Sequence, residues 1–178
     1  MASTTMSAAS ARPLTGDDAV AKLRALLPAF RSAMLVTHTM DGADPHARPM
    51  GLVGDPAAFD GALWFFSDDR SRKIAELARQ PRASLVLQSD RDSSYLHIVG
   101  SAAAVDDRAR MRELYTPILR TWFPEGLDDP HLTLIRFDAE RAEYWDSPGG
   151  MLQVLGAFTK AMVTGRPAEG GDQGTLEL

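Results

Sequence analysis

The chain has 178 residues and contains no cysteine. Disulfide bonds, zinc–thiolate sites and thiol nucleophiles are therefore excluded. No apolar run approaches the roughly 18 residues that indicate a membrane span. Basic residues are outnumbered, with 19 lysines and arginines against 24 acidic residues, so no general positive field attracts nucleic acid or an anionic membrane. Residues 1–12 lack the apolar core of a signal peptide, and we expect a cytoplasmic protein.

Several cofactor and catalytic motifs are also missing. No Gly-x-Gly-x-x-Gly follows an expected strand and no Walker-type loop occurs, so neither a Rossmann domain nor a P-loop is indicated. No Gly-x-Ser-x-Gly elbow supports serine catalysis. The histidines show no short ligand spacing, and we predict no metal site. We assign these four histidines no role: His38, His46, His97 and His131.

The length fits one globular domain with a sizeable core. Residues 1–14 are small and polar, and residues 166–178 begin with a stretch dense in glycine, proline and acidic side chains. Both ends are therefore predicted to be flexible. The folded domain is expected over residues 15–165.

Hydrophobic periodicity predicts many short strands and a few helices. Strands are expected over residues 34–39, 46–53, 62–66, 84–88, 95–105, 132–137 and 143–145. Helices are expected from Asp17 to Pro28, from caps at residues 67–69 to Arg79, from Asp106 to Trp122 with a break at Pro117, and over 152–163. Without regular βαβ alternation, this order predicts a mainly β (α+β) fold, an antiparallel barrel with flanking helices.

The segment 46–50 (His-Ala-Arg-Pro-Met) is the first candidate for a binding site. Side chains alternate along a strand, so Arg48 and Met50 are expected on one face and Pro49 on the other. A proline inside a strand interrupts the hydrogen-bond ladder and indicates an edge or a bulge, where the backbone can meet a ligand. Taken alone, the segment is better explained as an exposed edge strand with a solvated arginine.

The segment 65–73 (Phe-Phe-Ser-Asp-Asp-Arg-Ser-Arg-Lys) leads from a strand into the start of a helix. The amides of a first helical turn lack intrahelical partners and lie at the positive end of the helix dipole, which suits a phosphate. Ser67 and Ser71 add hydroxyl donors. Arg72 and Lys73 add positive charge, which in a first turn is unfavourable by roughly 0.3–1 kcal/mol each. A bound anion offsets that cost, so phosphate binding is favoured over a solvated surface helix.

The aromatic residues fall into two groups. Residues 64–66 (Trp-Phe-Phe) form a very apolar run that is expected in the core. Tyr95, Trp122 and Trp145 lie near the ends of expected elements, where amphipathic rings often meet a ligand or a subunit interface. For each of them taken alone, core or interface packing is the better interpretation.

Several short motifs follow one another in a characteristic order. They are residues 46–50, residues 63–67 (Leu-Trp-Phe-Phe-Ser), residues 71–73 (Ser-Arg-Lys) and residues 80–81 (Gln-Pro). Together they resemble the flavin-binding split barrels related to pyridoxamine 5′-phosphate oxidase. The resemblance is closer to the general stress protein branch, on Gly100, Asp106, residues 122–126, residues 129–130 and residues 143–146. It covers about residues 18–165 and lies in the order and spacing of the motifs.

The resemblance implies a fold and one half of a cofactor site. The fold is an antiparallel six-stranded split β-barrel that forms a homodimer, with two flavin sites at the subunit interface. Arg48, Pro49 and Met50 would line the edge of the isoalloxazine ring, and Arg48 could also reach phosphate or ring oxygens. Phe66 and Ser67 would border the ribityl chain and the phosphate.

The resemblance also implies the other half of the site. Three residues would hold the phosphate: Ser71, Arg72 and Lys73. Tyr95 occupies the position of a polar flavin contact in the oxidases. Trp145 matches an aromatic residue that crosses the interface from the partner, and Trp122 would add a further wall across that interface.

One departure from the oxidases concerns the substrate. Oxidases that act on pyridoxamine phosphate carry, after the final tryptophan, a basic C-terminal segment that binds the substrate phosphate. Here residues 146–150 (Asp-Ser-Pro-Gly-Gly) follow that tryptophan. The departure argues against pyridoxamine 5′-phosphate oxidase activity.

The implied function is FMN binding of the general stress protein type. FAD and deazaflavin are the alternative cofactors, and haem is less favoured because it would need a histidine as axial ligand. One form of this function is an FMN-dependent oxidoreductase with an unknown small-molecule substrate. The other is a non-catalytic flavin carrier or sensor, which the lack of identifiable substrate-binding residues favours mildly.

Overall fold

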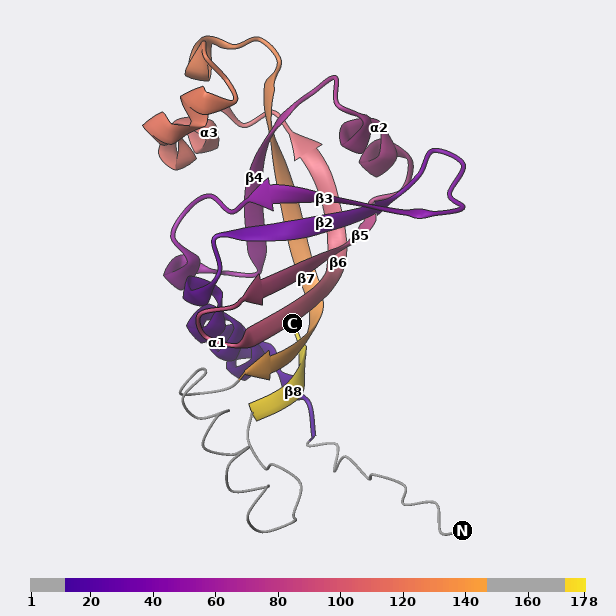
Figure 1. Cartoon of the computed structure of the whole chain (residues 1–178), viewed down its shortest axis with the longest axis vertical. Coiled ribbons are helices and arrows are strands. Elements are labelled where there is room, and N and C mark those ends of the chain that lie inside the picture. Colours follow the sequence, from indigo (N-terminus) through magenta and orange to yellow (C-terminus); the bar gives the residue numbers. More distant parts are fainter. Residues whose placement is uncertain (1–11, 147–171) are drawn as a thin grey trace.

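The computed structural model describes residues 12–146 and 172–178 of the chain (Figure 1). Over these residues the protein is mainly β, as predicted, with one curved, largely antiparallel sheet and a few short helices. The strand order is β1-β8-β7-β6-β5-β2-β3, and β4 pairs with β7 beside that path. The helix expected over 152–163 lies outside the described residues.

Three strands carry most of the residues discussed below: β2 (Ser32–His38), β3 (Pro45–Gly51) and β4 (Ala62–Asp68). β2 pairs with β3 on one side and with β5 (Arg82–Ser89) on the other. The remaining strands are β1 (Leu14–Thr15), β6 (Ser94–Val105), β7 (Leu132–Asp146) and β8 (Asp172–Glu177).

β7 is one long strand where the sequence predicted two separate ones. Its first half pairs with β4 and its second half with β8, while β6 runs along its other edge. The sheet is not closed: among the described residues β3 does not pair with β4, and only an isolated bridge joins Val53, which follows β3, to Trp64 of β4. The expected count of six strands is not confirmed: over the described residues the sheet has eight strands, because β1 and β8 extend it beside β7.

A β-bulge marks the point where β7 changes partners. The register between β6 and β7 shifts between Val99 and Gly100, which leaves Glu140 as the extra residue of β7. A Cβ atom built on Gly100 would lie 2.0 Å from the carbonyl oxygen of Asp138. The close approach of the two backbones therefore requires glycine at this position.

Helix α2 (Arg72–Arg79) begins later than the sequence predicted. The expected caps at residues 67–69 are instead occupied by the end of β4 and the following turn, and Ser71 is the N-cap residue. On its inward face Glu76 is buried beside Leu77, whereas Ala78 is exposed.

Two other helices follow the predicted signals in part. α1 (Gly16–Leu26) continues into a 3-10 turn that contains Pro28, close to the expected end. α3 (Arg108–Leu114) is shorter than expected, and the predicted break at Pro117 starts a separate 3-10 turn, η3 (Pro117–Thr121). Because the helix does not continue past Leu114, Ile118 and Trp122 do not lie on a common buried helix face, and both are exposed.

The C-terminal residues correct the prediction of a flexible tail. Residues 172–177 form β8, which pairs antiparallel with β7 and parallel with β1, so Leu14 at the other end of the chain is also in a strand. Leu176 is fully buried, and Lys22 of α1 donates a hydrogen bond of 2.8 Å to Asp172. Burial of Leu176 and the strand hydrogen bonds outweigh the loop-like composition of the preceding residues.

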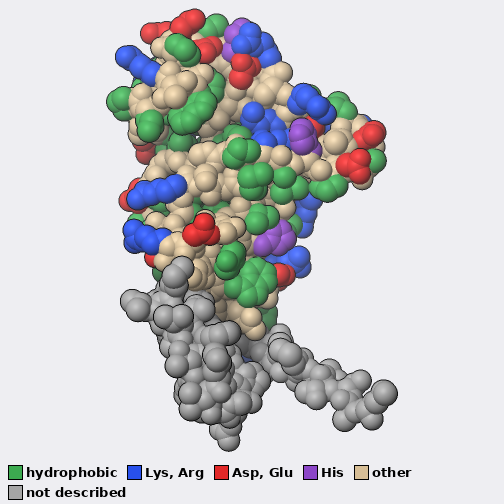
Figure 2. All heavy atoms as spheres, viewed as in Figure 1, with side chains coloured by type: hydrophobic (Ala, Val, Ile, Leu, Met, Phe, Trp, Pro, Cys, Tyr) green, Lys and Arg blue, Asp and Glu red, His purple; other side chains and the backbone are tan. Residues whose placement is uncertain are grey.

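The two faces of the sheet differ in character. Leu35, Leu85 and Ile98 are fully buried on the inner face, which forms the core. On the outer face, Met34 lies opposite Val86 and Tyr95 lies opposite Trp145; these four side chains are 39–47% exposed. Hydrophobic side chains lie across this face, over β2, β3, β5 and β6 (Figure 2).

Candidate functional site

The turn from β4 into α2 places several hydrogen-bond donors close together. The hydroxyl oxygens of Ser67 and Ser71 are 3.2 Å apart, Ser71 makes no side-chain cap, and the first turn of α2 contains no acidic residue. The two preceding carboxylates are bound elsewhere, Asp68 to Arg70 at 2.7 Å and Asp69 to His131 at 3.1 Å. The Ser67 hydroxyl also donates to the Asp68 carbonyl oxygen at 3.1 Å. The start of α2 therefore offers an anion its first-turn amides and the Ser71 hydroxyl.

Lys73 supplies positive charge at this helix start. Its side chain is half-buried, and none of the described carboxylates forms an ion pair with it. Burial lowers the pKa of Lys73 below its usual 10.5 and the nearby Arg48 lowers it further, while Asp68 and Glu76 act in the opposite direction. A desolvated ammonium beside a guanidinium favours a bound anion, which would restore its charge balance.

Glu76 lies beneath α2, and its side chain is completely buried. Its Oε2 atom accepts hydrogen bonds from Thr37 Oγ1 at 2.6 Å and from Arg48 Nη2 at 2.5 Å, and its Oε1 atom is 2.9 Å from His46 Nδ1. Burial alone would raise the pKa of Glu76, but these hydrogen bonds and the Arg48 charge lower it from 4.5 to about 2. The network therefore stabilises the fold above pH 4.5 and is lost as the pH falls through about 2.

Arg48 is held by both β2 and α2. Besides its bond to Glu76, Nη1 donates to Thr37 Oγ1 at 2.5 Å and Nη2 lies 2.8 Å from His46 Nδ1. Its side chain is 16% exposed and so is not fully enclosed. The hydrogen bonds fix the direction of the guanidinium.

The structure brings one part of the predicted site together around the start of α2. Lys73 is near Arg48, and Ser67 contacts Ser71. Arg72 is 74% exposed and lies 4.0 Å from Glu76. We call this group the α2 site; it consists of Arg48, Ser67, Ser71, Arg72 and Lys73.

Three other predicted residues lie beside the α2 site in sequence but point elsewhere. Met50 and Phe66 are buried, Met50 in the main core and Phe66 in a second cluster under α3. The Phe66 ring meets Tyr115 edge-on, with the ring centroids 6.4 Å apart. Pro49 is exposed on the outer face of β3, as the strand alternation predicted.

The remaining predicted aromatics do not join the α2 site within one chain. Tyr95 and Trp145 form a cross-strand pair on the outer face, whereas Arg48 points to the inner face. Trp122, directly after η3, is 67% exposed. Figure 1 shows α3, which precedes η3 in the chain, on the opposite side of the strands from α2.

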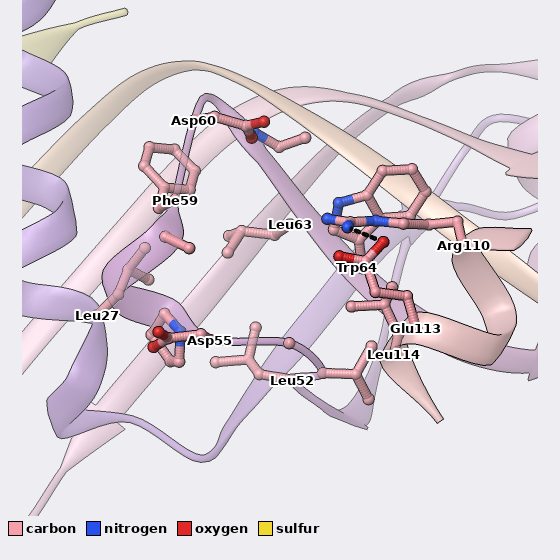
Figure 3. Close-up of a pocket in the computed structure, with 15 residues that line it drawn as sticks. Leu27, Leu52, Asp55, Phe59, Asp60, Leu63, Trp64, Arg110, Glu113 and Leu114 are labelled. Atoms are coloured by element: carbon pink, nitrogen blue, oxygen red, sulfur yellow. Dashed lines mark hydrogen bonds and ion pairs between the residues drawn. The ribbon is translucent and has the colours of Figure 1, made fainter. Parts of the chain in front are cut away.

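A separate cavity of about 300 Å³ opens between α3 and the segment that leads into β4 (Figure 3). None of the predicted site residues lines it. Its floor is apolar, and Arg110, which binds Glu113 at 2.6 Å, stacks over Trp64 at 5.1 Å. Asp55 and Asp60 also line it and add negative charge. Because the only lining arginine is already paired, the cavity does not suit a phosphate.

Three residues of this network, Thr37, His46 and Glu76, had no predicted role. The register of the β2–β3 hairpin puts Thr37 directly opposite His46, a pairing that the Asp41-Gly42 turn could have indicated. Glu76 lies between Ile74 and Leu77 on the buried side of α2, and a charged residue on an apolar stripe signals a buried partner.

No helix among the described residues is long and apolar enough to cross a membrane. The fold and the site define a mainly β protein with an open sheet and a basic helix-start site. The family model described as "Pyridoxamine 5'-phosphate oxidase like" matches residues 18–169, and the chain belongs to this family.

Similar solved structures agree with the general stress protein branch. A protein assigned as general stress protein 26 from Jannaschia sp. CCS1 is 26% identical, with a TM-score of 0.75 over 90% of this chain and 98% of that chain. The general stress FMN/FAD binding protein from Xanthomonas citri is 29% identical, with a TM-score of 0.61 over 74% of this chain and 90% of that chain. Protein bli-3 of Neurospora crassa is 25% identical over 114 residues; the match spans 60% of this chain and about half, 54%, of that protein.

Proposed function

We propose that the protein is a cytoplasmic FMN-binding protein of the general stress protein type, whose α2 site holds the phosphate of the flavin. The observation that carries this proposal is Lys73, a half-buried ammonium within electrostatic range of Arg48 that has no carboxylate partner among the described residues. A flavin phosphate supplies the missing negative charge, and charge-assisted hydrogen bonds are the strong ones.

The residues of the α2 site fit a phosphate by their chemistry. Lys73 and Arg48 supply charge, Ser67 and Ser71 supply hydroxyl groups, and the first turn of α2 supplies amides. A bound flavin supplies hydride or electron transfer, and the protein supplies its position and the exclusion of water. The similarity to a relative named as an FMN/FAD binding protein supports a flavin. We expect FMN in preference to FAD because the donors and cations of the α2 site gather at one helix start, which suits a single phosphate group.

Absorption spectroscopy and titration test this function. Purified protein is expected to show flavin bands or, after the flavin is removed, to bind FMN at one site per chain. Titrations with FAD, a deazaflavin and riboflavin rank the alternatives. A colourless protein that binds none of the phosphorylated flavins would refute the proposal.

The described residues favour a carrier or sensor and an oxidoreductase equally. Anaerobic mixing with NADH or NADPH separates the two. Repeated reduction and reoxidation of the bound flavin would identify an FMN-dependent oxidoreductase, while a flavin that binds without cycling would identify a carrier. Activity toward pyridoxamine 5′-phosphate is expected to be absent.

We also propose that the protein is a homodimer, joined through the outer face of the sheet. This face exposes four apolar or amphipathic side chains, Met34, Val86, Tyr95 and Trp145, which a second chain would cover. Replacing Val86 by glutamate is expected to raise the dimer dissociation constant by about 30-fold or more, because a central apolar contact would face a charge. Light scattering would then report 19.3 kDa instead of twice that mass.

Met40→Glu is the matched control for this dimer prediction. Met40 is 47% exposed, like Val86, but lies at the tip of the β2–β3 hairpin. The Met40 variant should remain dimeric. An unchanged mass for Val86→Glu would show that another surface joins the subunits.

The pH dependence of FMN binding follows from the Lys73 pKa. The phosphate group loses its second proton near pH 6, so affinity should rise from about pH 5 to 7. Lys73 binds the phosphate only when protonated, and its pKa in the free protein is lowered, so affinity should fall again as the pH rises through that lowered value. Dissociation constants measured from pH 5 to 10 test this. The alkaline decrease should disappear in Lys73→Met; if it persists there, Lys73 is not its cause.

A further inference from the structure

Two elements contribute the charges of the α2 site. Lys73 is on α2, whereas Arg48 comes from β3, which is remote in sequence and belongs to the β2–β3 hairpin. Two cations repel each other, so the folded chain must hold them together by other contacts. The contacts between α2 and this hairpin therefore decide the geometry of the site.

In the described part of the chain, the hydrogen bonds between α2 and the β2–β3 hairpin all end on Glu76. Its two carboxylate oxygens bind Thr37 of β2 and both His46 and Arg48 of β3. Glu76 is one helical turn beyond Lys73, on the buried side of α2. One carboxylate thus connects the helix that carries Lys73 to the strand that carries Arg48.

Thr37 strengthens the connection. Its hydroxyl accepts a hydrogen bond from Arg48 Nη1 and donates one to Glu76 Oε2, so the guanidinium is held by two of its nitrogens. A guanidinium held in this way has a fixed direction, and a ligand that binds it loses less side-chain entropy.

We infer that Glu76 is a positioning residue of the α2 site: although it is negatively charged, it promotes the binding of a phosphate anion by holding Arg48 beside Lys73. This inference rests on the proposed FMN-binding function and adds the residue that organises the phosphate site. The inference gives a role in binding to the Glu76 carboxylate, which is buried and is not expected to contact the flavin.

The direction in which FMN affinity changes when the Glu76 charge is removed tests this inference. If Glu76 acted on the ligand by charge alone, its removal would strengthen the binding of an anion. If it positions Arg48, its removal weakens that binding. Glu76→Gln is therefore expected to raise the dissociation constant of FMN by about tenfold or more, with little change for riboflavin, which lacks the phosphate.

Asp68→Asn is the matched control. Asp68 also acts on Lys73 electrostatically, but it binds Arg70 and makes no contact with Arg48. Its removal should leave FMN affinity unchanged or increase it. The two substitutions each remove one negative charge near Lys73, and the inference predicts opposite results.

A double-mutant cycle separates positioning from a general loss of structure. In an Arg48→Met background, Glu76→Gln should add no further loss of FMN affinity, because the side chain that it positions is gone. Thr37→Val keeps the shape of the side chain and removes the bridging hydroxyl, so it should weaken FMN binding in the same direction even if Glu76→Gln folds poorly.

Two results would overturn the inference while the proposed function stands. One is Glu76→Gln protein that is folded and binds FMN as tightly as the wild type or more tightly. The other is an equal loss of FMN and riboflavin affinity, which indicates a structural role. A wild-type protein that binds neither flavin would instead refute the proposed function itself.

Discussion

Replacing Lys73 by methionine is expected to weaken FMN binding by about 10- to 150-fold. The range is the loss of one charge-assisted hydrogen bond, about 1.5–3 kcal/mol, converted to an equilibrium constant. Methionine keeps the apolar stem of the side chain in its half-buried position, so the change removes mainly the charge. Isothermal titration or quenching of flavin fluorescence measures the effect, with riboflavin as the ligand that should not respond.

The same substitution should leave the free protein as stable as before or slightly more stable. Burial lowers the pKa of Lys73, which means that the charged ammonium costs free energy in the unliganded fold. A loss of affinity without a lower melting temperature would therefore separate binding from folding.

Two controls accompany this variant. Arg72→Ala removes a cation that is 74% exposed and should have a smaller effect than Lys73→Met. Lys22→Ala removes a lysine that binds Asp172 and should not change FMN affinity. Equal FMN binding by wild type and Lys73→Met would exclude Lys73 from the phosphate site, while a flavin could still bind elsewhere.

The predicted elements came from local signals, and these were strongest in the strands. The alternation in residues 46–50 correctly placed Arg48 and Met50 on one face and Pro49 on the other. The proline correctly indicated an edge strand, because β3 ends the strand order. Period-two patterns depend on residues that are adjacent in the chain, which explains why they could be read without the fold.

The sequence-based predictions were wrong for β7 and β8, where contacts between distant parts of the chain decide the structure. β8 is a strand because β7 and β1 offer it partners, and nothing near residues 172–177 in sequence announces them. The continuity of β7 likewise depends on the bulge opposite Gly100, which is a property of the pair of strands. Local composition reports only the propensity of the segment itself, and pairing with neighbouring strands can outweigh that propensity.

The candidate site divides in the same way. Ser67, Ser71, Arg72 and Lys73 were predictable because a helix start and its donors are local in sequence. Glu76 was not, since its importance comes from Thr37, His46 and Arg48, which are 28 to 39 residues away along the chain. A buried carboxylate becomes meaningful only when the side chains that neutralise it are known.

The predicted roles of the residues on the outer face of the sheet depend on a second chain. Within one chain, Tyr95 and Trp145 are a half-exposed pair remote from the α2 site. The resemblance that assigned them to the flavin implied that they act across a subunit interface. Their exposure leaves them available to a partner, so the proposed dimer and the proposed flavin site should be tested together.

Replacing Gly100 by alanine is expected to destabilise the protein by about 3 kcal/mol or more. The new Cβ atom would lie 2.0 Å from the carbonyl oxygen of Asp138 and 3.1 Å from the Phe137 ring. Overpacking usually costs about 1–3 kcal/mol, and here the obstacle is a backbone atom that cannot rotate away. For a domain of this size, that loss lowers the melting temperature by roughly 6–12 °C. Thermal unfolding followed by circular dichroism measures it.

Gly51→Ala is the matched control, because it makes the same chemical change in another strand of the same sheet. Gly51 lies at the end of β3, its backbone is not left-handed, and a Cβ atom built there meets nothing within 4 Å. Its substitution should change the free energy of unfolding by about 1 kcal/mol or less, since alanine also loses less entropy on folding. If Gly100→Ala were equally mild, β7 would have to yield at the bulge. The change of partner from β4 to β8 would then be a flexible joint, and not the rigid contact that the backbone approach indicates.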